Sequence, residues 1–494
     1  MLPQTAQSVD WALVGAPLAA AVAAVVVLVA DLLLGPARRG ALGWLALAGL
    51  AVAGALLVPL AGERRGTFCL PGPPAQSCSY VVDALTLPFQ AVTVAAAAVV
   101  VLLALPVVPA ERLPAGEHWF LLLSSVSGAL VLAAARDLMT LVVALEVVTL
   151  PTYALVALRR HDGRSSEAAL KLFLVSVVSV ATMLYGVALV YGATGQVLLD
   201  RVAAALADPA TAAGPAQLGV LLTLAGLAFK VAAVPFHWWA PDTYVGAPLP
   251  VTAFLSVVSK LAGFVGLLVV LSVGFPAYAD RWAPALAVLA VLTMSVGNLV
   301  ALRQRHAVRL LAWSSVAQSG YVLLPLGTAA DDLGRAVAAS AAYALAYAVM
   351  NLLALAAVVA AGPDAPGQWV ASYRGLWSRR PLVAGALALA LVSLAGLPPG
   401  LLGLFAKLVV LEAPVAAGAP WLAAAVAVNV VVGLAYYLAW GARLVARPDG
   451  PSPARPRPLP RAHAVALGAA LAAVLVLGFV PGPVLDAVGA VAAP

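Results

Sequence analysis

The chain is a succession of long apolar runs separated by short polar segments. Fourteen of these runs are long enough to cross the hydrocarbon core of a bilayer as a helix, which takes about 20 apolar residues. They cover residues 11–34, 41–61, 81–108, 117–135, 138–158, 166–193, 216–240, 250–272, 282–302, 310–327, 336–361, 382–417, 421–442 and 464–486. The sequence therefore predicts an all-α integral membrane protein with about 14 transmembrane helices, which we number in chain order.

The polar segments between the runs differ in charge. Those that follow the odd-numbered helices carry 17 arginines, whereas those on the opposite side carry six. By the positive-inside rule, the arginine-rich side faces the cytoplasm and both termini lie on the outer side. The first helix is not predicted to be a signal peptide, because its apolar run is too long and no Lys or Arg precedes it.

Two of the runs are interrupted within the membrane. Pro235 breaks the seventh run, and the sequence GLPPG at 396–400 breaks the twelfth. Proline removes a backbone donor and frees a carbonyl, which at membrane depth is tolerated only against protein or water. The two broken helices are predicted to cross in opposite directions, which fits two inverted five-helix repeats made of helices 4–8 and 9–13. The predicted organisation is a three-helix segment (1–116), a first repeat (117–272), a second repeat (282–442) and a final helix (464–486).

The positions of the charged residues indicate a function for this predicted helix bundle. Only 10% of the residues are charged, against about 25% in a soluble domain. The net charge of +7 comes from arginines in the loops, so it indicates topology and not a nucleic-acid surface. All four lysines, in contrast, lie within apolar runs: Lys171, Lys230, Lys260 and Lys407. Lysine, unlike arginine, can lose its proton when it is buried, so this distribution indicates protonatable sites inside the membrane.

A single acid, Glu146, lies near the centre of the fifth helix. A carboxylate at this depth is expected to be either neutral or partnered by a cation, and Lys230 is the candidate partner. The alternative is a purely structural Glu–Lys pair, which would leave the neighbouring helix break unexplained. We therefore expect Glu146, Lys230, Lys260 and Lys407 to form a proton relay.

Two further residues are weaker candidates for the relay. His237 follows the break in the seventh helix, where it can titrate or be a satisfied structural residue. Lys171 stands four residues after Glu167, so the two can pair on one helix face, and either a transport or an anchoring role fits it.

The chain carries two cysteines, Cys69 and Cys78, in one predicted outer loop. Two thiolates cannot hold an iron–sulfur cluster, which needs four, and no dinucleotide or P-loop glycine pattern is present. We therefore expect no metal and no redox cofactor in this chain. On the outer side a disulfide is permitted, and two free thiols are the alternative.

Five strings of the sequence resemble the antiporter-like membrane subunits of respiratory complex I, above all their bacterial subunit N branch. They are LEVVTLPTYALVALRR, SSEAALKLFLVSVVSVATMLYGVALVYGATG, GLAFKVAAVPFHWWAPDTYVGAP, LLAWSSVAQSGYVLL and SLAGLPPGLLGLFAKLVVLEA. The resemblance covers about residues 130 to 440. Fourteen helices and a lysine at position 407 also fit this branch.

The resemblance implies a proton-translocating subunit of an NADH–quinone oxidoreductase, and so part of a translocase. It assigns Glu146, Lys230 and Lys260 to the proton path and places Lys407 near the exit. It also implies that flavin, iron–sulfur clusters and quinone are held by partner subunits, that the partners are other membrane-arm subunits and the lipid bilayer, and that the site of action is the bacterial cytoplasmic membrane.

Two other functions remain open from the sequence. One is a subunit of an Mrp-type cation/proton antiporter, which shares the same core. The other is a membrane scaffold without an ion path. The four ionisable residues near mid-depth argue against this scaffold function.

Overall fold

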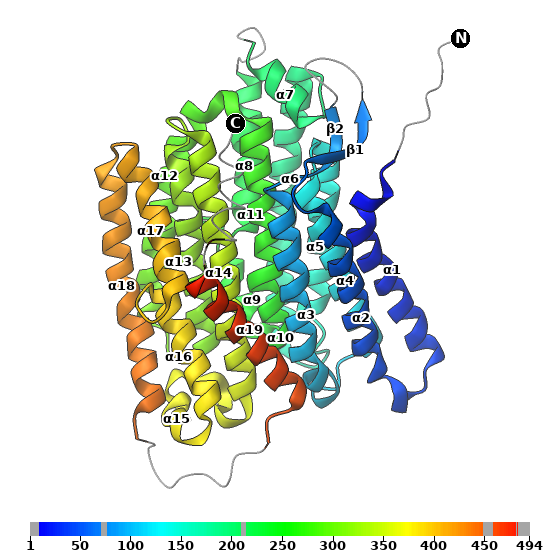
Figure 1. Cartoon of the computed structure of the whole chain (residues 1–494), viewed down its shortest axis with the longest axis vertical. Coiled ribbons are helices and arrows are strands. Elements are labelled where there is room, and N and C mark those ends of the chain that lie inside the picture. The colour runs from blue at the N-terminus through cyan, green and yellow to red at the C-terminus, as the bar shows by residue number, and fades with distance from the viewer. Residues whose placement is uncertain (1–8, 71–76, 209–213, 448–457, 481, 483–494) are drawn as a thin grey trace.

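The computed structural model describes residues 9–70, 77–208, 214–447, 458–480 and 482 as a bundle of helices with a small hairpin at one end (Figure 1). The helices are α1 Trp11–Leu33, α2 Ala41–Leu57, α3 Thr86–Ala110, α4 Ala115–Ala134, α5 Leu138–Val156, α6 Gly163–Thr194, α7 Leu199–Leu206, α8 Pro215–Lys230, α9 Trp239–Gly246, α10 Leu249–Phe254, α11 Lys260–Val269, α12 Ala279–Ala301, α13 Ala307–Leu323, α14 Leu333–Ala361, α15 Leu376–Arg379, α16 Pro381–Ala395, α17 Leu401–Ala416, α18 Pro420–Val445 and α19 Arg461–Phe479. The strands are β1 Arg65–Leu70 and β2 Ser77–Val82.

The predicted helical membrane fold is confirmed. Within the described residues, 11 helices are long and apolar enough to cross a membrane, and two shorter apolar helices, α8 and α16, belong to the broken runs. Each predicted run overlaps at least one helix of the structure. The total of 14 spans, the inverted repeats and the division into segments remain predictions. The last predicted run extends beyond Phe479, where α19 ends, into positions that lie largely outside the described residues.

Two elements form the centre of the bundle. One is α14, and the other is a continuous helix from Leu249 to Gly274 that comprises α10, a π-helical turn, α11 and a second π-helical turn. Both are buried along their apolar segments, whereas α1, α6 and α18 bury only about a third of theirs. Figure 1 shows α1 and α18 at opposite edges of the bundle and α19 crossing obliquely over its front. The central helices are therefore surrounded by protein.

The hairpin of β1 and β2 was not predicted, because the sequence favoured a helix from residue 81 onward. Tyr80, Val81 and Val82 instead pair with β1, and α3 begins only at Thr86. An apolar pair of valines fits a half-buried strand as well as a helix start, so hydropathy alone does not separate the two. Cys69 lies opposite Cys78 in the antiparallel register, and the two form a disulfide, which decides between the two alternatives left by the sequence.

An ion pair joins the hairpin to the helices below it. Arg136 donates to the Asp83 carboxylate at 2.7 Å and to the Thr86 hydroxyl at 2.9 Å. Burial acts to raise the pKa of Asp83, but the Arg136 charge and hydrogen bonds from Thr86 and Arg136 outweigh burial, so the pKa of this carboxyl is lowered. The charged form of Asp83 thus stabilises the folded hairpin end.

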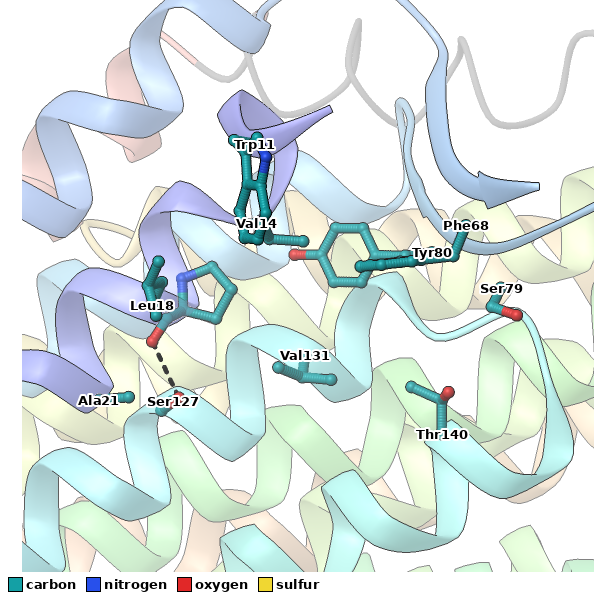
Figure 2. Close-up of a pocket in the computed structure, with 11 residues that line it drawn as sticks. Trp11, Val14, Leu18, Ala21, Phe68, Ser79, Tyr80, Ser127, Val131 and Thr140 are labelled. Atoms are coloured by element: carbon teal, nitrogen blue, oxygen red, sulfur yellow. Dashed lines mark hydrogen bonds between the residues drawn. The ribbon is translucent and has the colours of Figure 1, made fainter. Parts of the chain in front are cut away.

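A shallow apolar furrow of about 340 Å³ runs beneath the hairpin, between α1 and α4 (Figure 2). Trp11 and Tyr80 lie at its hairpin end, and Ser127 closes the contact between the two helices by donating to the Pro17 carbonyl at 2.9 Å. The furrow lies away from the lysines described below.

Candidate functional site

The seventh run is broken, but its helix ends earlier than predicted. The helix α8 stops at Lys230, five residues before Pro235. Proline lacks the N–H that would bond to the carbonyl four residues earlier and crowds that carbonyl, so the helix cannot continue past the preceding turn. The carbonyl set free at Val231 accepts a hydrogen bond from the Ser319 hydroxyl at 2.6 Å. A protein group therefore provides the hydrogen bond that the freed carbonyl needs, because lipid in the membrane interior cannot provide it.

Lys230 is buried at this helix end, and its direct partner is not the expected carboxylate. Its ammonium donates to the Thr149 hydroxyl of α5 at 2.7 Å. Glu146 lies three residues before Thr149, on the same side of α5. In the part of the chain that the structure describes, no ion pair within 4.0 Å joins Glu146 to Lys230, and one carboxylate oxygen is buried without a hydrogen bond. The predicted Glu–Lys pair is thus not a direct one, because Lys230 bonds to Thr149, one turn from Glu146 on α5.

Lys260 is completely buried at the centre of the bundle. Its ammonium donates three hydrogen bonds, to the Ser315 carbonyl at 2.8 Å, the Ser315 hydroxyl at 2.7 Å and the Ser319 hydroxyl at 2.9 Å. The π-helical turn at Leu255–Ser259 lies directly before it. Such turns are rare and occur often at functional sites, because they shift the side chains that follow out of the regular helical register.

Lys230 and Lys260 belong to one cluster. Gly263, one turn after Lys260, packs against the Lys230 side chain so closely that a Cβ atom on it would lie 2.8 Å from Lys230 Cγ. Ser319 connects the two sides, because its hydroxyl accepts from Lys260 and donates to the carbonyl of Val231, the residue after Lys230. The sequence predicted both lysines but not the serine between them.

Lys407 belongs to α17, and its side chain reaches back to the second break. Its ammonium donates to the Ala395 carbonyl, the last residue of α16, at 2.6 Å and stands 5.3 Å from the centre of the Tyr321 ring. Gly396 has a φ of +81°, and a Cβ atom there would lie 2.6 Å from Lys407 Cδ. Glycine is therefore required here both by the left-handed backbone and by the lysine that covers it.

Hydroxyl and amide groups of α13, α14 and α18 form a hydrogen-bonded network of their own. Gln318 of α13 accepts from the Tyr343 hydroxyl and donates to the Tyr437 hydroxyl at 3.1 Å, and Tyr437 in turn bonds to Ser314. The Tyr343 ring lies 5.8 Å from that of Tyr321, which contacts Lys407. This group comes near both lysines: Ser314 precedes Ser315, which bonds to Lys260, and the Tyr343 ring approaches the Tyr321 ring that contacts Lys407.

The sequence analysis did not assign a role to these residues. The signal was present in the string AWSSVAQSGY, where polar residues recur at positions 314, 315, 318 and 319 of an otherwise apolar run. This spacing places them on neighbouring faces of one helix. Serine and tyrosine are common in buried helices, however, so spacing alone does not show that they meet lysines.

The two weaker candidates lie outside this cluster. His237 is buried between the rings of Trp238 and Trp313, at 4.7 and 5.2 Å, and neither ring nitrogen has a hydrogen-bond partner. Lys171 is half exposed and forms ion pairs with Glu167 at 2.7 Å, which was expected, and with Asp242 at 2.8 Å. Asp242 also pairs with Arg309 at 3.2 Å, so Lys171 helps to tie α6, α9 and α13 together. Among the described residues, no group of three or more His, Cys, Asp or Glu side chains is arranged to hold a metal ion.

The buried lysines and helix breaks lie within a segment that matches a known family. Residues 135–433 match the family described as NADH:quinone oxidoreductase/Mrp antiporter, TM. The chain belongs to this family.

Similar proteins agree with the family assignment. NADH-quinone oxidoreductase subunit N 2 of Streptomyces griseus is 54% identical over 454 residues, which are 91% of this chain and 85% of that protein. A chain of respiratory complex I from Thermus thermophilus is 34% identical with a TM-score of 0.78, over 96% of this chain and 99% of that one. A chain of the Mrp complex from Dietzia, at 23% identity and a TM-score of 0.81 over 96% of this chain and 97% of that one, shares the fold.

Proposed function

We propose that this chain is a proton-translocating membrane subunit of an NADH–quinone oxidoreductase. The observation that carries the proposal is a set of ionisable groups inside the bundle: Lys230, Lys260 and Lys407, which are buried and hydrogen-bonded, and Glu146, which lies one turn from the Thr149 hydroxyl that Lys230 contacts. An ionisable group is costly at membrane depth, so three buried lysines and one glutamate within the spans of one protein favour a function. The names of similar proteins support the oxidoreductase, and the electron transfer itself would take place in partner subunits.

The proposed mechanism begins at Lys230. Burial disfavours the charged form of a lysine, and a nearby carboxylate favours it. A movement of Glu146 relative to Lys230 therefore changes how tightly Lys230 holds its proton, by about 1.4 kcal/mol for each unit of pKa. Because Lys230 bonds to Thr149 and forms no ion pair with Glu146, the movement can alter the distance between the two groups without breaking a direct ion pair.

The proton would then pass to Lys260 by way of Ser319. Its hydroxyl accepts a hydrogen bond from Lys260 and bonds to the carbonyl of Val231, the residue after Lys230. In this step the hydroxyl would give its own proton to the free amine of Lys260 and take one from a water molecule that the Lys230 ammonium has protonated. From Lys260, the hydroxyls of Ser315, Tyr343 and Tyr437, with water molecules between them, provide groups that can exchange protons toward Lys407. In this proposal Lys407 releases the proton on the outer side, and the arginine-rich loops face the bacterial cytoplasm.

The experiment that tests the proposal starts from the native complex. Purification with a tag on this chain should bring down flavin and iron–sulfur subunits, and the reconstituted complex should acidify vesicles when NADH and a quinone are supplied. Lys260→Ala should lower this acidification while the complex remains assembled. Co-purification with cation/proton antiporter subunits alone would favour the Mrp function, and full pumping by the alanine variant would contradict a proton path through this chain.

A further inference from the structure

Lys260 and Lys407 differ in how their ammonium groups are bonded. Lys260 donates three hydrogen bonds to oxygen atoms, whereas Lys407 donates one, to the Ala395 carbonyl at 2.6 Å, among the described residues. A tyrosine ring lies near each nitrogen, with the centre of Tyr347 at 6.0 Å from Lys260 and that of Tyr321 at 5.3 Å from Lys407. An ammonium has three N–H groups, so the charge on Lys407 depends far more on its ring than the charge on Lys260 does.

Packing holds the Tyr321 ring and the Lys407 ammonium group together from both sides. On the lysine side, the backbone at Gly396 lies so close that a Cβ atom there would be 2.6 Å from Lys407 Cδ. On the ring side, Gly320 directly precedes Tyr321, and a Cβ atom on Gly320 would lie 2.6 Å from the Met294 backbone nitrogen of α12. The close contact of α13 with α12 therefore fixes the position of the ring.

The hydroxyl group of Tyr321 has a different partner, which is Asn298 of α12. Asn298 is itself held by two neighbours of α18, because its amide nitrogen donates to the Asn429 side chain at 3.1 Å and its oxygen accepts from Tyr436 at 3.0 Å. The hydroxyl thus belongs to the contact between α12 and α18. What Tyr321 offers to Lys407 is the face of its ring.

An aromatic face distinguishes the two protonation states of a lysine. The π electrons make the face negative, so it attracts an ammonium group, and the attraction is stronger where water is excluded. A free amine carries no charge and gains no such attraction. The ring of Tyr321 therefore favours the protonated state of Lys407 over the neutral one.

No ion pair involves Lys407 in the part of the chain that the structure describes, and no charged side chain acts on it. Of the segments that pack against α17, α16 and the turn Leu324–Thr328 contain no titratable side chain. α19 carries Arg461 and His463 in its first turn but meets α17 at Gly478, near its other end. Glu412 of α17 itself is exposed. Apart from arginines in a terminal turn, the titratable side chains of α13, α14 and α18 are tyrosines, namely Tyr321, Tyr343, Tyr347, Tyr436 and Tyr437.

We propose that the ring face of Tyr321 stabilises the protonated form of Lys407, so that Tyr321 is a positioning residue that sets the pH range in which this lysine takes up its proton. The proposal rests on the proposed function, in which Lys407 takes up and releases protons. Uptake places a positive charge at the ring face, and release removes it. The ring itself neither gains nor loses a proton.

Two substitutions separate the ring from the hydroxyl. In the reconstituted complex, protons pumped per NADH oxidised are measured against pH. Tyr321→Phe keeps the ring and should pump like the wild type at every pH. Tyr321→Leu removes the ring, so the pH at which pumping falls to half on the alkaline side should move down by about 0.4 to 1.5 units. Tyr373→Leu, which removes an equally buried ring packed on Trp440, is the control and should not move the profile.

Three results would overturn the proposal: a phenylalanine variant that fails like the leucine variant, a leucine variant with the wild-type profile, or a leucine variant that pumps less by the same factor at every pH. Fluorinated phenylalanines at position 321 decide the question if the leucine variant does not assemble. Each added fluorine withdraws electrons from the ring face and hardly changes its shape, so the profile should move down stepwise with fluorine number. A profile that does not respond to fluorine would also overturn the proposal.

A double-mutant cycle measures the contact without any measure of pumping. Tyr321→Leu and Lys407→Met are compared singly and together in the melting temperature of the purified complex. If the ring stabilises the ammonium group, the double variant should lose less than the sum of the two single losses, and additive losses would contradict the contact. If Lys407→Ala pumped normally, the proposed function would fail at this lysine, whereas the coupling measured by melting would stand.

Discussion

Lys260 and Ser319 are joined by a hydrogen bond of 2.9 Å, and the same serine bonds to the helix end that carries Lys230. One hydroxyl therefore contacts both sides of the predicted relay. We expect Ser319→Ala to lower proton pumping several-fold and to destabilise the protein by about 1–3 kcal/mol, since the carbonyl of Val231 is left buried without a partner. Vesicle acidification and thermal unfolding of the purified complex measure the two effects. Ser272→Ala, which removes a hydroxyl far from the lysines, is the control and should change neither.

Lys260 itself can be tested by charge. Lys260→Ala removes the proton carrier, and Lys260→Arg keeps a charge that cannot be released. Both variants should lose most of the pumping if the lysine must give up its proton. Quinone reductase activity and acidification should be measured on the assembled complex, and wild-type pumping by the arginine variant would show that only a fixed charge is needed.

Glu146 forms no ion pair with Lys230, whose ammonium bonds to Thr149, so we expect its charge to act on Lys230 through space. Glu146→Ala should therefore leave the fold intact and impair pumping, and Glu146→Asp should retain part of the activity. Thr149→Val should also impair pumping, since it keeps the shape of the side chain but leaves the Lys230 ammonium without its bond. A threonine variant with normal acidification would argue that Lys230 finds another partner.

Gly396 is held against Lys407 at the second break. Gly396→Ala is expected to be disruptive, because its Cβ would lie 2.6 Å from Lys407 Cδ at a φ of +81°. The lysine must move, so proton release should slow and stability should fall by about 1 kcal/mol or more. Gly468→Ala, at a helix position with open space around it, is the control. Equal pumping by the two variants would show that the position of Lys407 is not restricted.

The Asp83–Arg136 ion pair gives the hairpin end a dependence on pH. The pKa of Asp83 is lower in the folded protein than in the unfolded chain, so its stabilising effect is present above the unfolded value and is lost as the pH falls through the folded one. The difference in melting temperature between the wild type and Asp83→Asn should therefore be largest at neutral pH and shrink below about pH 4. A difference that stays constant from pH 7 to pH 3 would exclude this role of the charge.

The sequence predicted the ionisable residues of the site but not the groups that join them. Lysine and glutamate in apolar runs are conspicuous because burying them is costly, and proline and glycine mark the breaks. Ser319 and Tyr347 carry no such signal, since a hydroxyl is easily buried once it bonds to a backbone carbonyl. Only the packing of α13 against the central helices shows that these hydroxyls meet Lys260.

The sequence likewise predicted the main elements of the fold but not all of its details. Hydropathy located the helices because every span needs about 20 apolar residues. It missed the strand at Tyr80 because two valines suit either structure, and it placed the break at Pro235 although the helix ends at Lys230. The proline in the sequence shows why the helix breaks. The helix ends about one turn before the proline, because the hydrogen bond that proline cannot make is the one to the carbonyl four residues earlier.

The burial of Lys260 also has a consequence for synthesis of the chain. Its partners Ser315 and Ser319 come 55 and 59 residues later in the sequence. At a translation rate of about 5–20 residues per second, the ribosome needs roughly 3 to 12 seconds to add them. During that interval the partners of Lys260 in α13 have not yet been synthesised. The insertion machinery or the helices made earlier must therefore keep this lysine out of contact with lipid until α13 is in place.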